Sequence, residues 1–116
     1  MQTRVIGFIP PVVGIEGDFN TFRLGVKYSK VLSPGEEVYL LNEKDKIIIG
    51  RAQVQRVESG PLGELVVEHA AKNHTELAND PTHAHVRLYE TLKKIYGPHI
   101  VSIGKKATVI YLKRLE

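Results

Sequence analysis

The sequence contains no cysteine and no tryptophan among its 116 residues. Without cysteine the chain can form neither a disulfide nor a thiolate metal site, and it has no thiol nucleophile. No apolar run approaches the ~20 residues that a membrane helix requires. We therefore expect a soluble protein that has no membrane partner and whose fold depends on packing alone.

The sequence also lacks the features of a signal peptide, and its length suits a single domain. The chain opens with MQTR, which lacks the basic, apolar and small-residue layout of a signal peptide, so we expect a cytoplasmic protein. A hydrophobic content of 42% and a charged content of 25% are ordinary for a globular protein. We expect residues 1–116 to form one domain, of unknown oligomeric state.

The charge is distributed unevenly along the chain, although the formal net charge is only +3. Residues 61–86 carry one Lys against three Glu and one Asp, whereas residues 87–116 carry seven basic and two acidic residues. A basic excess is compatible with a polyanionic partner such as RNA, and solubility alone would explain it equally well.

Hydrophobic spacing predicts an α+β fold. Strands are expected at residues 5–9, 37–41, 47–57 and 107–112, and helices at residues 19–23, 62–70 and 81–96. The boundary signals are Pro10-Pro11, Asp18 and Gly25, Ser59-Gly60-Pro61, Asp80-Pro81 and Gly97-Pro98. Residues 27–31 are expected to be an exposed segment. The last strand is apolar on both faces, which predicts a central position in the sheet.

This order of elements does not alternate as in a doubly wound sheet. It favours a curved mixed sheet or a small pseudo-barrel with helices packed outside.

Two adjacent stretches carry a family resemblance. Residues 25–32 read GVKYSKVL and residues 33–38 read SPGEEV. Here the chain resembles the ASCH domains of the PUA-like superfamily, whose pattern Gly-x-Lys-x-x-Thr-x-Arg precedes a Gly-containing turn and a hairpin. Gly25 and Lys27 match this pattern, while Lys30 stands at the Thr position and Leu32 at the Arg position. The order of the later elements is also similar, so that the resemblance runs from Phe19 onward.

The resemblance implies a basic cleft between barrel and helices that binds RNA or a modified nucleoside. Arg23, Lys27, Tyr28 and Lys30 are grouped so that cations could contact phosphates while the ring stacks on a base. A solvated basic loop would have the same composition.

One face of a predicted strand offers a second set of polar groups. Arg51, Gln53 and Gln55 share that face of residues 47–57, where they could read base edges. A strand that faces solvent would look the same.

A catalytic alternative also follows from the resemblance. Some compact ASCH proteins are similar to amidohydrolases that remove an acyl group from a modified cytidine, using a Lys, a Thr and a Glu. The family's Glu position falls near Asn73. In this chain Lys27 would be the base and Ser29 the nucleophile or anchor, with Glu76 or Glu68 as the acidic partner. We expect a binding module rather than an enzyme; the amidohydrolase and a structural, partner-binding domain remain alternatives.

The histidines do not have the spacing of a metal site. No pair shows the one-turn spacing that places two ligands on one helix face, and the side chains of His83 and His85 diverge by about 200° on a helix. His69 lies on an apolar stripe, at the expected edge of the core. The glycines do not form a phosphate-binding loop. We therefore expect neither a metal nor a cofactor.

Overall fold

The computed structural model describes residues 4–10 and 12–115. Five strands, three α-helices and two short 3₁₀ turns follow one another along the chain. In order they are β1 (Arg4–Phe8), β2 (Asp18–Leu24), α1 (Lys27–Val31), β3 (Glu37–Asn42), β4 (Ile47–Pro61), α2 (Leu62–His69), η1 (Ala70–Lys72), η2 (Pro81–His83), α3 (Ala84–Tyr96) and β5 (Lys106–Arg114). The predicted α+β class is confirmed.

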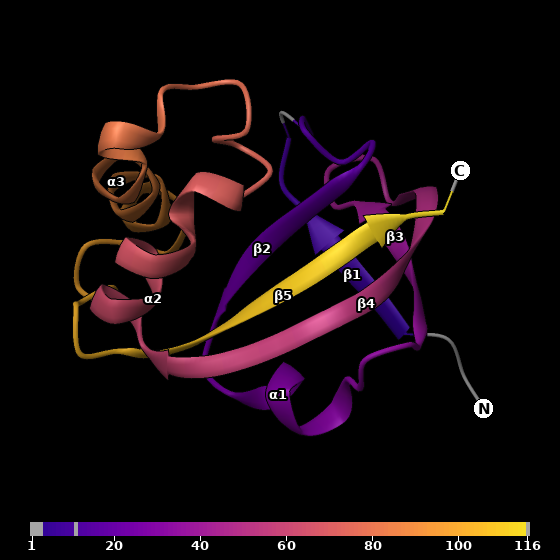
Figure 1. Cartoon of the computed structure of the whole chain (residues 1–116), viewed down its shortest axis with the longest axis horizontal. Helices are drawn as coiled ribbons and strands as arrows, with labels where there is room; N and C mark the ends of the chain where they lie inside the picture. Colours follow the sequence, from indigo (N-terminus) through magenta and orange to yellow (C-terminus); the bar gives the residue numbers. More distant parts are fainter. Residues whose placement is uncertain (1–3, 11, 116) are drawn as a thin grey trace.

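The five strands form one mixed, strongly twisted sheet in the order β1-β3-β4-β5-β2 (Figure 1). β1 pairs with β3 in parallel, and the other neighbouring pairs are antiparallel. Register shifts at Leu40/Leu41 and Val54/Arg56 increase the local twist, as β-bulges do. The sheet is not closed, because β1 and β2 are both edge strands and do not pair with each other.

Buried side chains form one hydrophobic cluster on each face of the sheet. Inside the curve, residues such as Ile6, Leu40 and Ile110 pack together, and on the other face Leu88 of α3 packs with Val109 of β5. β5 contributes to both clusters and lies between β4 and β2. The prediction that residues 107–112 form a central strand is thus confirmed. α2 and α3 lie side by side over the outer cluster, and α1 lies beside β4 (Figure 1).

The predicted helix at residues 19–23 is wrong, because these residues belong to β2. Phe19 and Phe22 are three residues apart, a spacing typical of one helix face, but in the strand they point into opposite clusters. Each buried ring contributes roughly 2 kcal/mol, more than the ~0.5 kcal/mol by which helix propensities differ per residue. Pairing with β5 therefore decides the local structure.

Two other boundaries differ from the prediction. Residues 27–31, expected only to be an exposed segment, form the helix α1; none of them is buried, and no side chain caps the start of the helix. Ser59, Gly60 and Pro61 do not break β4, because they pair with Thr108, Ala107 and Lys106 of β5. The strand ends at Pro61, a position where proline is tolerated.

The remaining boundary signals behave as expected. The Asp80 side chain accepts a hydrogen bond of 2.9 Å from the Thr82 backbone N–H and so begins the helical region that leads into α3. Gly97 ends α3 with a φ of 98°, a conformation that favours glycine. Within the proline pair expected to end β1, Pro11 lies outside the described residues. None of the described helices has both the length and the apolar character needed to cross a membrane.

Candidate functional site

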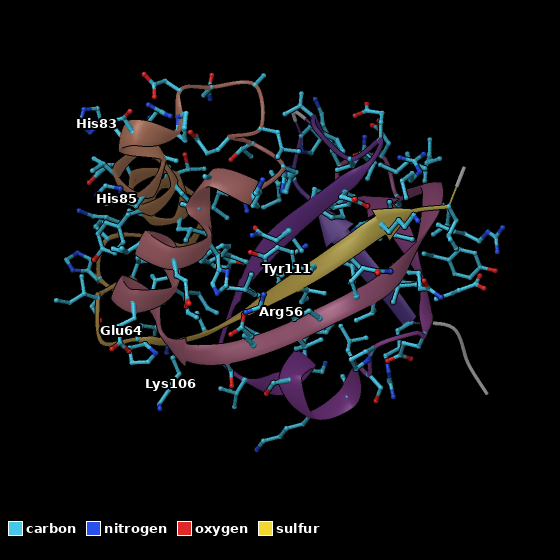
Figure 2. The ribbon with its side chains drawn as sticks, in the orientation of Figure 1. Arg56, Glu64, His83, His85, Lys106 and Tyr111 are labelled. Atoms are coloured by element: carbon cyan, nitrogen blue, oxygen red, sulfur yellow. The ribbon has the colours of Figure 1, made fainter. Side chains whose placement is uncertain are left out.

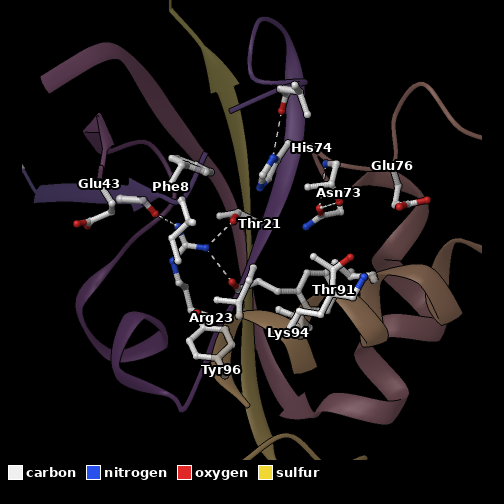
Figure 3. A pocket seen from close by; sticks show the side chains of 18 of the residues that line it. Phe8, Thr21, Arg23, Glu43, Asn73, His74, Glu76, Thr91, Lys94 and Tyr96 are labelled. Atoms are coloured by element: carbon white, nitrogen blue, oxygen red, sulfur yellow. Dashed lines mark hydrogen bonds between the residues drawn. The ribbon is translucent and has the colours of Figure 1, made fainter. Parts of the chain in front are cut away.

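A cavity of about 810 Å³ lies where the two edge strands of the sheet approach each other. Its walls come from the end of β1, from β2, from the loop at residues 73–76 and from α3 (Figure 3). Tyr28 of α1 and Glu43 of the β3–β4 hairpin complete the lining. Cavities of several hundred Å³ accommodate small organic ligands.

Arg23 bridges the two edge strands beside this cavity. Its Nη1 donates to Thr21 Oγ1 at 2.6 Å and to the Phe22 carbonyl at 2.8 Å, and its Nη2 donates to the Gly7 carbonyl of β1 (Figure 3). The guanidinium also lies 5.2 Å from the centre of the Phe8 ring. A backbone carbonyl of an open sheet edge is thereby satisfied by a side chain instead of another strand.

The environment of Arg23 is only partly polar. Burial lowers the pKa of Arg23, and the neighbouring Tyr96, Tyr28 and Glu43 act in the opposite direction. An arginine remains charged under such conditions. Tyr96 lies beside Arg23 in the cavity (Figure 3). The arrangement provides a fixed cation next to two tyrosine rings.

His74 provides an uncharged acceptor at the same cavity. Its Nδ1 lies 3.1 Å from the Val13 carbonyl, and because a carbonyl only accepts, Nδ1 carries the proton and Nε2 carries the lone pair. The ring packs edge-on against Phe8 and Phe19. Burial lowers the pKa of His74 to about 4, the charge of Arg23 adds to this effect, and the Val13 hydrogen bond opposes it. His74 is therefore neutral at pH 7.

The loop that carries His74 is attached to β2 by buried amides. Asn20 Nδ2 donates to the His69 carbonyl at 2.8 Å, and the His74 N–H donates to the Asn20 carbonyl at 3.1 Å. Asn73 Oδ1 accepts from the Thr75 N–H at 3.0 Å and from Thr75 Oγ1 at 2.7 Å. These bonds hold the loop against the sheet, so that its polar groups keep fixed positions.

Glu76 adds a buried carboxylate, since only 5% of the residue is exposed. Arg87 Nε donates to its Oε1 at 2.7 Å. The charged residues that line the cavity are Arg23, Lys94, Glu43 and Glu76, two of each sign. The sequence predicts a basic cleft, whereas the formal charges of the lining residues are balanced.

The structure places three of the residues singled out in the sequence at this cavity: Arg23, Tyr28 and Glu76. Lys27 and Lys30 are exposed on α1 and are not part of the lining.

Ser29, Arg51 and Gln53 also lie outside the cavity lining. The Ser29 hydroxyl donates to the Val26 carbonyl at 2.6 Å. Arg51 pairs with Glu37 at 2.7 Å, and Gln53 donates to the Gly35 carbonyl at 3.2 Å. The structure thus does not bring Lys27, Ser29 and Glu76 together, and the binding roles of the outlying residues stay predictions.

Thr21 and His74 also line the cavity but were not predicted as site residues from the sequence, and Asn73 was named there only as the position near which the family's Glu falls. His74 has no local signal, since its position depends on the contact with Asn20.

The solved structures that are similar to this chain include the following two. Protein EF3133 from Enterococcus faecalis V583, of family DUF984, superposes with a TM-score of 0.59 and 10% identity over 90% of this chain and 64% of that chain. The ASCH domain from Lactobacillus crispatus JV V101 superposes with a TM-score of 0.54 and 11% identity over 87% of this chain and 65% of that chain. The fold is ASCH-like.

Because both sequence identities are low, the similarity to these two structures concerns the fold alone. The chain spans slightly less than two thirds of the length of either structure. No family model and no curated protein matches the sequence.

Proposed function

We propose that the cavity binds a nucleobase or nucleoside, either free or as part of an RNA chain. The observation that carries this proposal is the combination of aromatic rings and fixed hydrogen-bonding groups around one space of about 810 Å³. Tyr28 and Tyr96 offer ring faces on which a base can stack. The ASCH-like fold agrees with such a role, because the family resemblance implies binding of RNA or a modified nucleoside.

The polar groups suit the edge of a base. Arg23 supplies hydrogen-bond donors, and the Glu76 carboxylate and the lone pair at His74 Nε2 supply acceptors. Such groups are the complement of the amide-like donors and acceptors on a nucleobase. The balanced charge of the lining favours an uncharged base inside the cavity. Phosphates of an RNA would then remain outside, where Lys27 and Lys30 are exposed on α1.

A pair of tyrosine substitutions tests where the ligand binds. Isothermal titration calorimetry would measure the binding of the four ribonucleosides and of short single-stranded RNA. We expect Tyr96→Ala to weaken binding about tenfold or more, because loss of a stacking ring costs ~1–3 kcal/mol. Tyr39→Ala is the matched control, since Tyr39 lies on β3 outside the cavity. Equal affinities of the two variants would contradict the proposal.

Salt dependence separates binding of the base from binding of the backbone. If Lys27 contacts a phosphate, Lys27→Ala should weaken RNA binding and reduce the salt slope by about one, while nucleoside binding stays unchanged. A loss of nucleoside binding in Lys27→Ala would instead place the ligand at α1.

Catalytic turnover of a modified nucleoside can be measured with the same protein. Incubation with acylated cytidine followed by mass spectrometry tests the amidohydrolase alternative. Unchanged substrate at high protein concentration would leave binding as the activity of this cavity. That alternative named Lys27, Ser29, Glu76 and Glu68, of which only Glu76 lines the cavity.

A further inference from the structure

A second group of polar side chains lies where the end of α2 meets β4 and β5. Glu58 of β4 and Glu68 and His69 of α2 place one ligand atom each within 4.8 Å of one another. His69 Nε2 is 3.1 Å from Glu58 Oε2 and 3.2 Å from Glu68 Oε2. None of these residues lines the cavity described above. Figure 2 shows Tyr111 and Arg56, which flank the group, on the part of the sheet beside α2.

The group contains a buried nitrogen that lacks a hydrogen bond. His69 is only 3% exposed, yet its Nε2 has no hydrogen-bond partner within the described part of the chain. Glu58 Oε2 is buried as well and forms an ion pair with Arg56. Buried polar atoms are nearly always satisfied by protein, water or an ion. Because Nε2 points toward two carboxylates without a hydrogen bond to either, a bound cation would satisfy all three groups at once.

The orientation of His69 agrees with this interpretation. Its Nδ1 lies 2.6 Å from the Tyr111 hydroxyl, and the two rings pack edge to face with centres 5.4 Å apart. When Nδ1 donates its proton to this hydroxyl, the lone pair resides on Nε2 and faces the carboxylates. A histidine that binds a metal commonly has its other nitrogen held by such a bond.

The spacing between His69 Nε2 and each of the two carboxylate oxygens also fits a shared ion. Nitrogen and oxygen ligands lie about 2.0–2.2 Å from Zn²⁺, so two ligands of one ion are roughly 3.0–3.5 Å apart. The separations of 3.1 and 3.2 Å fall in this range. Imidazole nitrogen combined with carboxylate oxygen suits Zn²⁺ and similar transition ions better than Mg²⁺, which prefers oxygen.

The Arg56 side chain already contacts this group of metal-ligand candidates. Arg56 Nη2 lies 2.5 Å from Glu58 Oε2, and its guanidinium lies 5.4 Å from the centre of the Tyr111 ring. The Arg56 side chain is 55% exposed, so it can turn toward solvent when an ion binds. The Glu68 side chain is 65% exposed, which gives an ion a path from solvent and leaves positions for water.

We propose that Glu58, Glu68 and His69 bind a divalent transition-metal ion, with one nitrogen ligand, two carboxylate ligands and open positions toward solvent. This site is separate from the proposed nucleoside cavity and does not depend on it.

Titration of the purified full chain with Zn²⁺ tests the proposal, with Glu68→Gln as the variant and Glu64→Gln as its matched control. Both glutamates are exposed on α2, and Glu64 lies outside the group. We expect calorimetry to show one Zn²⁺ bound by the wild-type chain and by Glu64→Gln. Glu68→Gln should bind it at least tenfold more weakly, because a direct ligand is lost.

The visible spectrum of bound Co²⁺ provides a second readout of metal coordination. The same two glutamate variants are compared, so that the buried His69, which contributes to the core, is left unchanged. Wild type and Glu64→Gln should give ligand-field bands that Glu68→Gln lacks. Absence of stoichiometric Zn²⁺ binding by the wild-type chain would overturn the proposal. Binding that Glu68→Gln does not weaken, or that Glu64→Gln weakens equally, would also overturn it, since the ion would then occupy other histidines or the helix surface.

Discussion

At the scale of single residues, Arg23 and His74 show how the cavity combines polar groups with burial. Arg23 satisfies a carbonyl of the opposite edge strand, and His74 stays neutral because burial disfavours its charged form. The sequence predicts Arg23 as a binding residue, grouped with Lys27, Tyr28 and Lys30 and placed in a helix at residues 19–23. Its role as a bridge could not be predicted, because Gly7 and Arg23 meet only after the sheet has curved.

The bridge leads to a prediction about stability. Arg23→Met should lower the free energy of unfolding by about 2 kcal/mol, because three hydrogen bonds are lost and the Gly7 carbonyl loses a charged donor. Urea denaturation measures the change. Arg4→Met is the matched control on β1, the other edge strand. Among the described residues Arg4 makes one exposed hydrogen bond, to the Val31 carbonyl, so its loss should cost ~0.5 kcal/mol or less. Similar losses in both variants would refute the bridge.

His74 leads to a prediction about pH. Its pKa is about 4 in the folded chain and about 6.5 in the unfolded chain, so the unfolded state binds the proton first as the pH falls. The contribution of His74 to stability is therefore complete above pH 6.5 and decreases down to pH 4, by up to about 3 kcal/mol. Urea denaturation of wild type and His74→Gln at pH 7, 5.5 and 4 measures it. A constant difference between the two proteins would show that His74 titrates normally.

At the scale of elements, local signals predicted most boundaries, and tertiary contacts decided the exceptions. Asp80-Pro81 and Gly97 marked α3 correctly, since caps act within one turn. β2 was mistaken for a helix because its two phenylalanines bury on opposite faces of a sheet that the sequence alone does not reveal. α1 has no capping side chain, so the sequence contains no signal that predicts the start of this helix.

The loop before β2 allows a matched test of glycine. Gly14 has a φ of 72°, and a Cβ there would overlap the His74 backbone carbonyl, whereas a Cβ on Gly17 would meet nothing within 4 Å. We expect Gly14→Ala to destabilise the chain by more than ~1 kcal/mol and to weaken ligand binding by displacing His74. Gly17→Ala should change stability by less than ~1 kcal/mol. Thermal denaturation compares them; equal midpoints would contradict the close packing of this loop on His74.

At the scale of the whole molecule, the ASCH-like arrangement was predictable as a class, while the cavity was not. The order of strands and helices already excluded a doubly wound sheet and favoured a curved mixed sheet with outer helices. The cavity, however, joins residues from Gly7 to Tyr96, which the open edges of the sheet and the packing of α3 bring together. Such long-range proximity leaves no pattern in a single sequence.

A nuclear magnetic resonance titration of the ¹⁵N-labelled chain with the four ribonucleosides is the most direct test of a base bound in this cavity. We predict saturable shifts of backbone amides at residues 21–23, 73–76 and 91–96 for at least one nucleoside. Shifts confined to α1 and the outer face of β4, or no shifts at millimolar ligand, would contradict the proposed binding site.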